Sequence, residues 1–69
     1  MGDTFALTER EKEVYELLCH GLMDKEISAR LGLSLETVKK HNKNIYTKLG
    51  VRNRVEAVLV AHQQGGMAS

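Results

Sequence analysis

The sequence predicts an all-α domain, a tetrahelical bundle of four helices that contains a helix-turn-helix. The 69 residues include no proline, and no stretch alternates apolar and polar residues for long enough to indicate a sheet. Apolar residues instead recur three and four positions apart, between capping residues and glycines. A chain of this length forms one domain, residues 1–69, and we expect its core to span about residues 7–64 with flexible ends at 1–6 and 65–69.

The first two helices are predicted from their capping residues. In "TERE", Thr8 can accept a hydrogen bond from the backbone of Glu11 while the Glu11 side chain reaches back, which is a capping box. This first helix should end at Gly21. Asp24 is then expected to cap a short second helix that ends at Gly32.

The third and fourth helices follow with little linker between them. Ser34 is predicted to cap the third helix, which spans about residues 35–49 and stops at Gly50. The fourth is expected to span about residues 53–64, before the glycine pair at 65–66.

The second and third predicted helices have the composition of a helix-turn-helix. The small Ser28 lets two helices approach closely, and Gly32 suits the tight turn between them. The apolar positions that would lock this pair against another helix are Ile27, Leu31 and Val38. Helix bundles that do not bind DNA also use such turns, so the motif alone does not fix the function.

Charge is divided unevenly between the two halves of the chain. Residues 1–36 carry eight acidic and four basic side chains, a net charge of −4. Residues 37–69 carry six basic side chains and one acidic one, a net charge of +5. Such an asymmetry is typical of proteins that bind a polyanion. The alternative is a solvated lysine face without a partner.

The positive charge gathers on one face of the third predicted helix. At about 100° per residue, Val38, Ile45 and Leu49 share an apolar stripe. Lys40 and Lys43 fall on the opposite side of that helix. In a helix-turn-helix this second helix enters the major groove of double-stranded DNA, so the lysines would meet base edges or phosphates.

The motifs "LTERE", "DKEIS", "TVKKH" and "KLGVRNRVEAV" stand in this order within residues 7–58. This pattern resembles the LuxR-type (GerE-like) DNA-binding domain of bacterial transcription regulators. The resemblance implies a four-helix domain that binds double-stranded DNA as a dimer on paired half-sites, with the third helix in the major groove. The single cysteine, Cys19, rules out an internal disulfide and suits a reducing cytoplasm, where we expect the domain to act.

The helical positions and the resemblance together give a set of expected DNA contacts, which are Thr37, Lys39, Lys40, His41, Lys43, Asn44 and Thr47. Two of these have a simpler explanation. Thr37 could serve only to cap the helix, and His41 could pack against the first helix instead of contacting DNA.

The fourth predicted helix is apolar on two sides. Val55, Val58 and Leu59 form one stripe, which we expect to close the core. The second stripe is predicted to be the contact of a symmetric homodimer, and its residues are Ala57, Val60, Ala61 and Gln64. Scattered surface alanines and a valine would be the alternative explanation.

Other classes of site find little support in the sequence. The spacing of Cys19, His20, His41 and His62 matches no structural zinc pattern, so neither a metal nor a cofactor is expected. Cys19 has no positioned base, and this argues against an enzyme.

Partners other than DNA are also weakly indicated. The basic helix lacks the broad apolar face of a membrane-surface helix. A glutamate of the first helix could pair with Arg52 or Arg54. RNA polymerase is a candidate partner for the acidic first helix, although no motif supports it. The main alternative function is a protein-interaction module whose acidic first helix docks on a basic partner.

Overall fold

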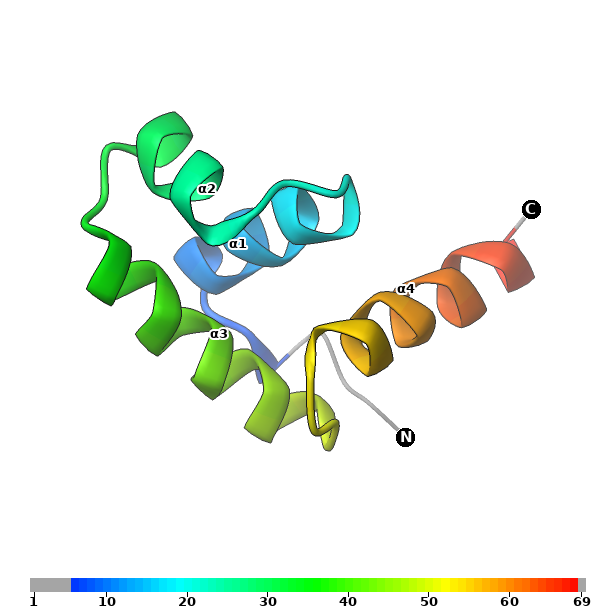
Figure 1. Ribbon diagram of the computed structural model, residues 1–69. Helices are drawn as coiled ribbons and strands as arrows, with labels where there is room; N and C mark the ends of the chain where they lie inside the picture. The colour runs from blue at the N-terminus through cyan, green and yellow to red at the C-terminus, as the bar shows by residue number, and fades with distance from the viewer. Residues whose placement is uncertain (1–5, 69) are drawn as a thin grey trace.

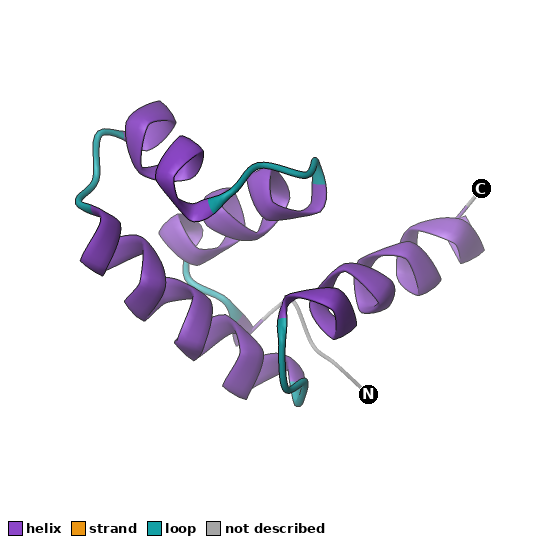
Figure 2. Ribbon diagram, in the orientation of Figure 1, coloured by secondary structure: helices purple, strands orange, loops and turns teal. Residues whose placement is uncertain are grey.

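The computed structural model describes residues 6–68, and the side chains of residues 6–63. Within that part of the chain four helices and no strand are present (Figures 1 and 2). They are α1 (Glu9–Cys19), α2 (Asp24–Leu31), α3 (Leu35–Leu49) and α4 (Arg54–Ala68). The all-α prediction is therefore confirmed.

The long helix α3 packs against each of the other three helices, and α1 packs against α2, α3 and α4. Figure 1 shows α2 and α3 diverging from a short connection, with α1 behind them. The C-terminal part of α4 extends away from the other helices (Figure 1). One side of α3 is therefore held by the bundle, and its opposite side is free.

Capping hydrogen bonds begin two of the helices as predicted. The Thr8 hydroxyl accepts from the Glu11 backbone N–H at 3.1 Å, and the Thr8 N–H donates to the Glu11 carboxylate at 3.0 Å. At the start of α3, the Thr37 N–H donates to Ser34 Oγ at 3.1 Å. Gly50 ends α3 in the left-handed conformation with φ of 72°, which a residue with a Cβ adopts only with strain.

The start of α2 differs from the prediction. Met23 occupies the N-cap position and Asp24 is the first helical residue, so the prediction that Asp24 caps this helix was wrong. The Met23 N–H donates to the Glu26 carboxylate at 2.8 Å. The carboxylate of Asp24 instead accepts a hydrogen bond from Asn42 of α3.

Helix α4 continues further than the expected end at residue 64 and reaches Ala68. A glycine in a helix costs about 1 kcal/mol relative to alanine without blocking the helix, so the pair at 65–66 does not enforce a stop. At the other end of α4, the Glu56 N–H donates to Asn53 Oδ1 at 3.0 Å. Residues 1–5 and 69, for which flexible ends were predicted, lie outside the described residues.

The core is built mainly from apolar side chains that all four helices supply. Its buried members are Leu7, Val14, Tyr15, Leu18, Ile27, Val38, Ile45, Leu49 and Ala57. Val38, Ile45 and Leu49 are the stripe expected for the third helix, so the orientation of α3 was predicted correctly. Its lysine side consequently faces away from the bundle.

The orientation of α4 was predicted correctly only in part, because Val58 packs against the core as expected and its two stripe partners do not. Val55 and Leu59, which were expected in the core, are 67% and 52% exposed. Ala57, which was expected at a dimer contact, is fully buried, and its carbonyl accepts a hydrogen bond from the Tyr15 hydroxyl at 2.9 Å. The small side chain of Ala57 lets α4 lie close to α1, and Val55 and Leu59 are left outside.

Candidate nucleic-acid interface

The outward face of α3 carries the positive charge. Lys39, Lys40, Lys43 and Thr47 are exposed. Within the described side chains, no ion pair engages any of these three lysines. Lys48, in contrast, donates to the Glu11 carboxylate at 2.7 Å. The three free lysines therefore form a surface of unneutralised positive charge, which we call the lysine face.

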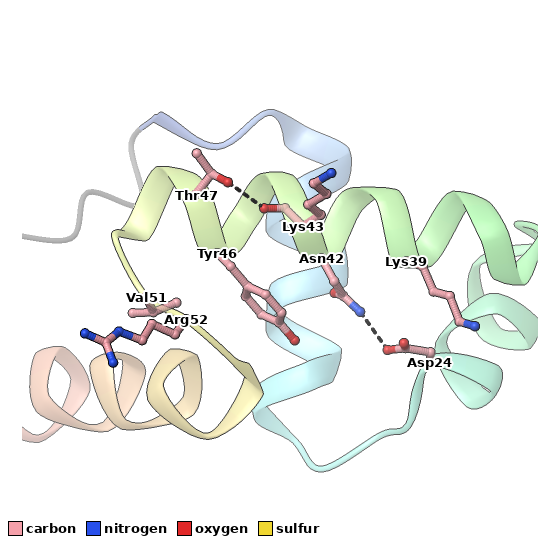
Figure 3. Close-up of a pocket in the computed structure, with 8 residues that line it drawn as sticks. All are labelled: Asp24, Lys39, Asn42, Lys43, Tyr46, Thr47, Val51 and Arg52. Carbon is pink, nitrogen blue, oxygen red and sulfur yellow. Dashed lines mark hydrogen bonds between the residues drawn. The ribbon is translucent and has the colours of Figure 1, made fainter.

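An open groove of about 360 Å³ runs beside the lysine face. Its lining residues come from α3, from the start of α2 and from the connection between α3 and α4 (Figure 3). They are Asp24, Lys39, Asn42, Lys43, Tyr46, Thr47, Val51 and Arg52. Three expected DNA contacts thus share one concave surface.

Arg52 is a residue of this groove that sequence reasoning did not assign to the interface. It is exposed and lies in the connection that follows Gly50, on the same side as Lys43 and Thr47. A cation from a second element extends the lysine face beyond α3. Its position directly after the predicted helix could have suggested this role.

The remaining expected contacts are less accessible. Thr37 is partly buried, and its hydroxyl accepts from Ser34 Oγ at 2.8 Å, which supports a capping role. His41 is partly buried, and its Nδ1 is enclosed without a hydrogen-bond partner in the described protein. Asn44 is also partly buried. The accessible part of the predicted set is therefore the lysines and Thr47.

A polar cluster with one buried member, Asn42, lies at the edge of the groove. Asn42 is 5% exposed, and its Nδ2 donates to Asp24 Oδ1 at 2.6 Å (Figure 3). Arg54 Nη1 lies 3.7 Å from the same oxygen, and Arg54 also donates to the Leu22 carbonyl. Sequence reasoning missed Asn42, although its place about 40° from Val38 on the helix put it on the core side.

Ion pairs between helices differ from those expected. A pair between a glutamate of the first helix and Arg52 or Arg54 was expected, and this was wrong for the described residues. Glu11 of α1 pairs with Lys48 of α3 because these two helices face one another. Arg54 pairs with Asp24 because the first turn of α4 lies beside the connection between α1 and α2.

The protonation of the buried groups follows from their surroundings. Burial alone would raise the pKa of Glu11, but the hydrogen bonds from Lys48 and from the Thr8 backbone outweigh it and hold this pKa below its usual value. Burial raises the pKa of the Cys19 thiol, so this residue stays protonated and is a poor nucleophile. Burial likewise raises the pKa of Tyr46, with a further contribution from the charge of Asp24, and this phenol remains a neutral hydrogen-bonding group beside the groove.

The described residues form neither a metal site nor a membrane-spanning helix. No three side chains of His, Cys, Asp or Glu gather there as a metal site would require. None of the described helices combines the length and the apolar composition that crossing a membrane demands.

Residues 6–61 match the sequence model of a known family, the bacterial regulatory proteins of the luxR family. The chain belongs to this family. All four helices fall wholly or largely within the matched region. The LuxR-type helix-turn-helix is therefore formed by α2 and α3.

Similar proteins support the assignment over most of the domain. The chain is 51% identical over 53 residues to the probable transcriptional regulatory protein SgaR of Hyphomicrobium methylovorum, covering 77% of this chain and 25% of SgaR. It is 54% identical over 50 residues to the transcriptional regulatory protein UhpA of Escherichia coli, covering 72% of this chain and 26% of UhpA. The solved structure of the response regulator StyR matches with a TM-score of 0.81 and 41% identity, over 86% of this chain and 30% of StyR. This LuxR-type chain thus spans less than a third of each of these relatives.

Proposed function

We propose that this LuxR-type domain binds double-stranded DNA sequence-specifically for a bacterial transcription regulator. The single observation that carries the proposal is the lysine face, which lies on the second helix of a helix-turn-helix and lacks carboxylate partners among the described residues. The second helix of this motif enters the major groove, where phosphates and base edges would supply the missing partners.

The exposed residues take different roles in this proposal. Lys39, Lys40 and Lys43 meet base edges or phosphates, because lysine can donate to guanine O6 and N7 as well as to phosphate oxygens. Thr47 lies further along the groove, and Arg52 adds a phosphate contact from the connection after α3.

The partly buried residues of the expected set have more restricted roles. The Thr37 N–H is already bonded to the capping Ser34 Oγ, whereas the Thr37 hydroxyl accepts from Ser34 and keeps its own proton to donate to a phosphate near the α3 N-terminus. Asn44 lies outside the residues that line the groove and stays a predicted contact with the DNA. His41 stays a predicted contact whose enclosed Nδ1 is more compatible with packing than with DNA binding.

We also infer a homodimer through α4, on a revised surface. The contact is formed by the exposed Val55 and Leu59 together with the partly buried Val60. Ala57 and Ala61 are excluded, because Ala57 is enclosed within one copy and Ala61 packs against the core of that copy. Gln64, the fourth residue of the predicted contact, has a side chain outside the described residues.

The location and the protein partners of the domain are inferred from the same DNA-binding role. The domain acts as a non-enzymatic reader in the cytoplasm, and the exposed acids of α1 offer a surface to RNA polymerase. The competing possibility is a protein-interaction module. Such a module would keep its affinity for its partner after removal of Lys40 and Lys43 and would ignore duplex DNA.

Fluorescence anisotropy with labelled duplex pools of random and bacterial promoter sequence tests the DNA-binding function. We expect binding at low salt, with enrichment of paired half-sites, and at least about a tenfold loss in Lys40→Ala/Lys43→Ala. Lys12→Ala is the matched control, because Lys12 is an exposed lysine on α1, outside the lysine face. An absence of duplex binding at low salt, or an equal loss in the control, would contradict the proposal.

A further inference from the structure

Three elements of the domain meet at one carboxylate. Asp24 begins α2, Asn42 lies in the middle of α3, and Arg54 begins α4. Asp24 Oδ1 accepts from Asn42 Nδ2 at 2.6 Å and lies 3.7 Å from Arg54 Nη1. Figure 3 shows the Asp24–Asn42 bond on the flank of α3 that adjoins Lys39.

Asn42 depends on this carboxylate for its hydrogen bonding. The side chain is 5% exposed, and its Oδ1 is enclosed without a partner in the described protein. The bond to Asp24 satisfies the Nδ2 group of this buried amide. Without that bond, the amide would be favoured to turn toward water, because a buried polar group without partners is costly.

A rotation of α3 about its axis would carry the Asn42 amide toward water, and the same rotation would move the residues that read DNA. Lys43 is the next residue in the chain, and Lys39 is three positions earlier. A rotation of about 20° carries a side chain at the helix surface, roughly 6 Å from the axis, through about 2 Å. Hydrogen bonds to base edges do not tolerate this displacement, whereas attraction to phosphates falls off slowly with distance.

The ion pair with Arg54 explains how the carboxylate of Asp24 can lie in a groove that would hold DNA. Asp24 lines the same groove as Lys39 and Lys43, where an isolated negative charge would repel DNA phosphates. The guanidinium of Arg54 balances that charge from the side of α4. The same contact ties the first turn of α4 to the start of α2.

We propose that Asp24 is a positioning residue for sequence readout, which fixes the rotation of α3 through Asn42 and is neutralised by Arg54. This proposal rests on the DNA-binding function proposed above. It assigns to Asp24 the discrimination between DNA sequences, and it assigns the sequence-independent attraction to phosphates to other residues.

The test compares Asp24→Ala with Glu26→Ala in the 69-residue chain. Both variants remove one negative charge from the first turn of α2, and both remove a hydrogen bond, since Glu26 accepts from the Met23 N–H. Only Asp24 also contacts α3 and α4. Affinities for a duplex selected from the random pool and for an unselected duplex are measured at one salt concentration, well below the melting temperature of each variant.

We expect Asp24→Ala to lower the ratio of selected to unselected affinity by about tenfold, which corresponds to the lower end of a hydrogen bond to a charged group. Affinity for the unselected duplex should match that of Glu26→Ala within about twofold, since the two variants lose the same charge. An unchanged ratio would overturn the proposal, whether the two affinities stay at their parent values or fall by the same factor. If the parent protein itself shows no preference among duplex sequences, the result would instead contradict the sequence-specific DNA binding proposed above.

A rescue experiment keeps the proposal testable if Asp24→Ala folds poorly. Asn42→Asp places two carboxylates against each other and should lower the ratio. The double variant Asp24→Asn/Asn42→Asp exchanges donor and acceptor between α2 and α3 at the parent net charge, and it should return the ratio to within about threefold of the parent. Failure of this exchange to improve on Asn42→Asp alone would argue against a direct link.

Discussion

At the scale of single residues, Glu11 combines two roles that usually fall to separate side chains. Its carboxylate accepts from the Thr8 N–H at 3.0 Å, which caps α1, and from Lys48 Nζ at 2.7 Å, which joins α1 to α3. The residue is 4% exposed. The position of α3 therefore depends on a buried charge as well as on apolar packing.

We expect Glu11→Gln to lower the free energy of unfolding by about 1 kcal/mol at pH 7, because glutamine retains the cap but loses the charge that attracts Lys48. The pKa of Glu11 is held below its ordinary value of 4.5. The ionised group therefore stabilises the fold above pH 4.5, and this contribution is lost as the pH falls through the lower pKa of the folded state.

Urea denaturation of parent and variant at pH 7 and near pH 3 measures this effect. The difference between them should shrink at the acidic pH, because the contribution of the ionised carboxylate falls as the pH falls below 4.5. The control is Glu13→Gln, which removes an exposed carboxylate from the same helix. A difference for Glu11→Gln that stays constant with pH would contradict the assignment.

The sequence predicted the local contacts of single residues better than the distant ones. The bond between Thr8 and Glu11 spans three residues, so helix geometry alone predicts it. The Asn42–Asp24 and Lys48–Glu11 bonds span 18 and 37 residues. These two depend on how the helices pack, and no spacing rule identifies their partners.

At the scale of elements, the start of α3 depends on its cap. We expect Ser34→Ala to lower the free energy of unfolding by about 1 kcal/mol, because the Thr37 N–H loses the acceptor that it has at 3.1 Å. Ser28→Ala is the matched control, since Ser28 Oγ donates to the Lys25 carbonyl within α2 and caps no helix. Urea denaturation would show equal losses in the two variants if the cap were unimportant.

The face that α4 presents to the core could not be predicted from its apolar pattern. One stripe contains Val55 and Leu59, and the other contains Ala57 and Ala61, so either could have faced inward. The hydrogen bond from the Tyr15 hydroxyl to the Ala57 carbonyl requires the α4 backbone to lie near α1. Small side chains allow that approach, whereas larger ones would hold the helices apart.

The exposed stripe of α4 makes a prediction about self-association. Leu59→Glu should weaken dimer formation, because it places a charge where two copies of Leu59 would meet. Sedimentation at increasing protein concentration, with and without a duplex of paired half-sites, measures the effect. Met23→Glu is the control, since Met23 is 60% exposed and lies in the connection before α2. Identical masses for parent, variant and control would remove this surface as the contact.

At the scale of the whole molecule, the near-neutral net charge hides a polarised distribution. The acids of α1 are partly neutralised locally, as in the exposed pairs Arg10–Glu13 at 3.2 Å and Lys12–Glu9 at 3.6 Å. Such exposed pairs contribute little to stability. The lysine face has no comparable pairs among the described residues, so attraction to a polyanion originates mainly there.

This distribution predicts how DNA binding responds to salt. If Lys39, Lys40, Lys43 and Arg52 each neutralise one phosphate, the logarithm of affinity should fall with the logarithm of salt at a slope of about −3.6 for one domain and about −7 for a bound pair. Anisotropy titrations at several salt concentrations give this slope. Arg52→Ala should reduce its magnitude by about 0.9 per domain, and Lys12→Ala should leave it unchanged. A slope near zero, or an equal change in the two variants, would show that the groove beside α3 does not hold the DNA backbone.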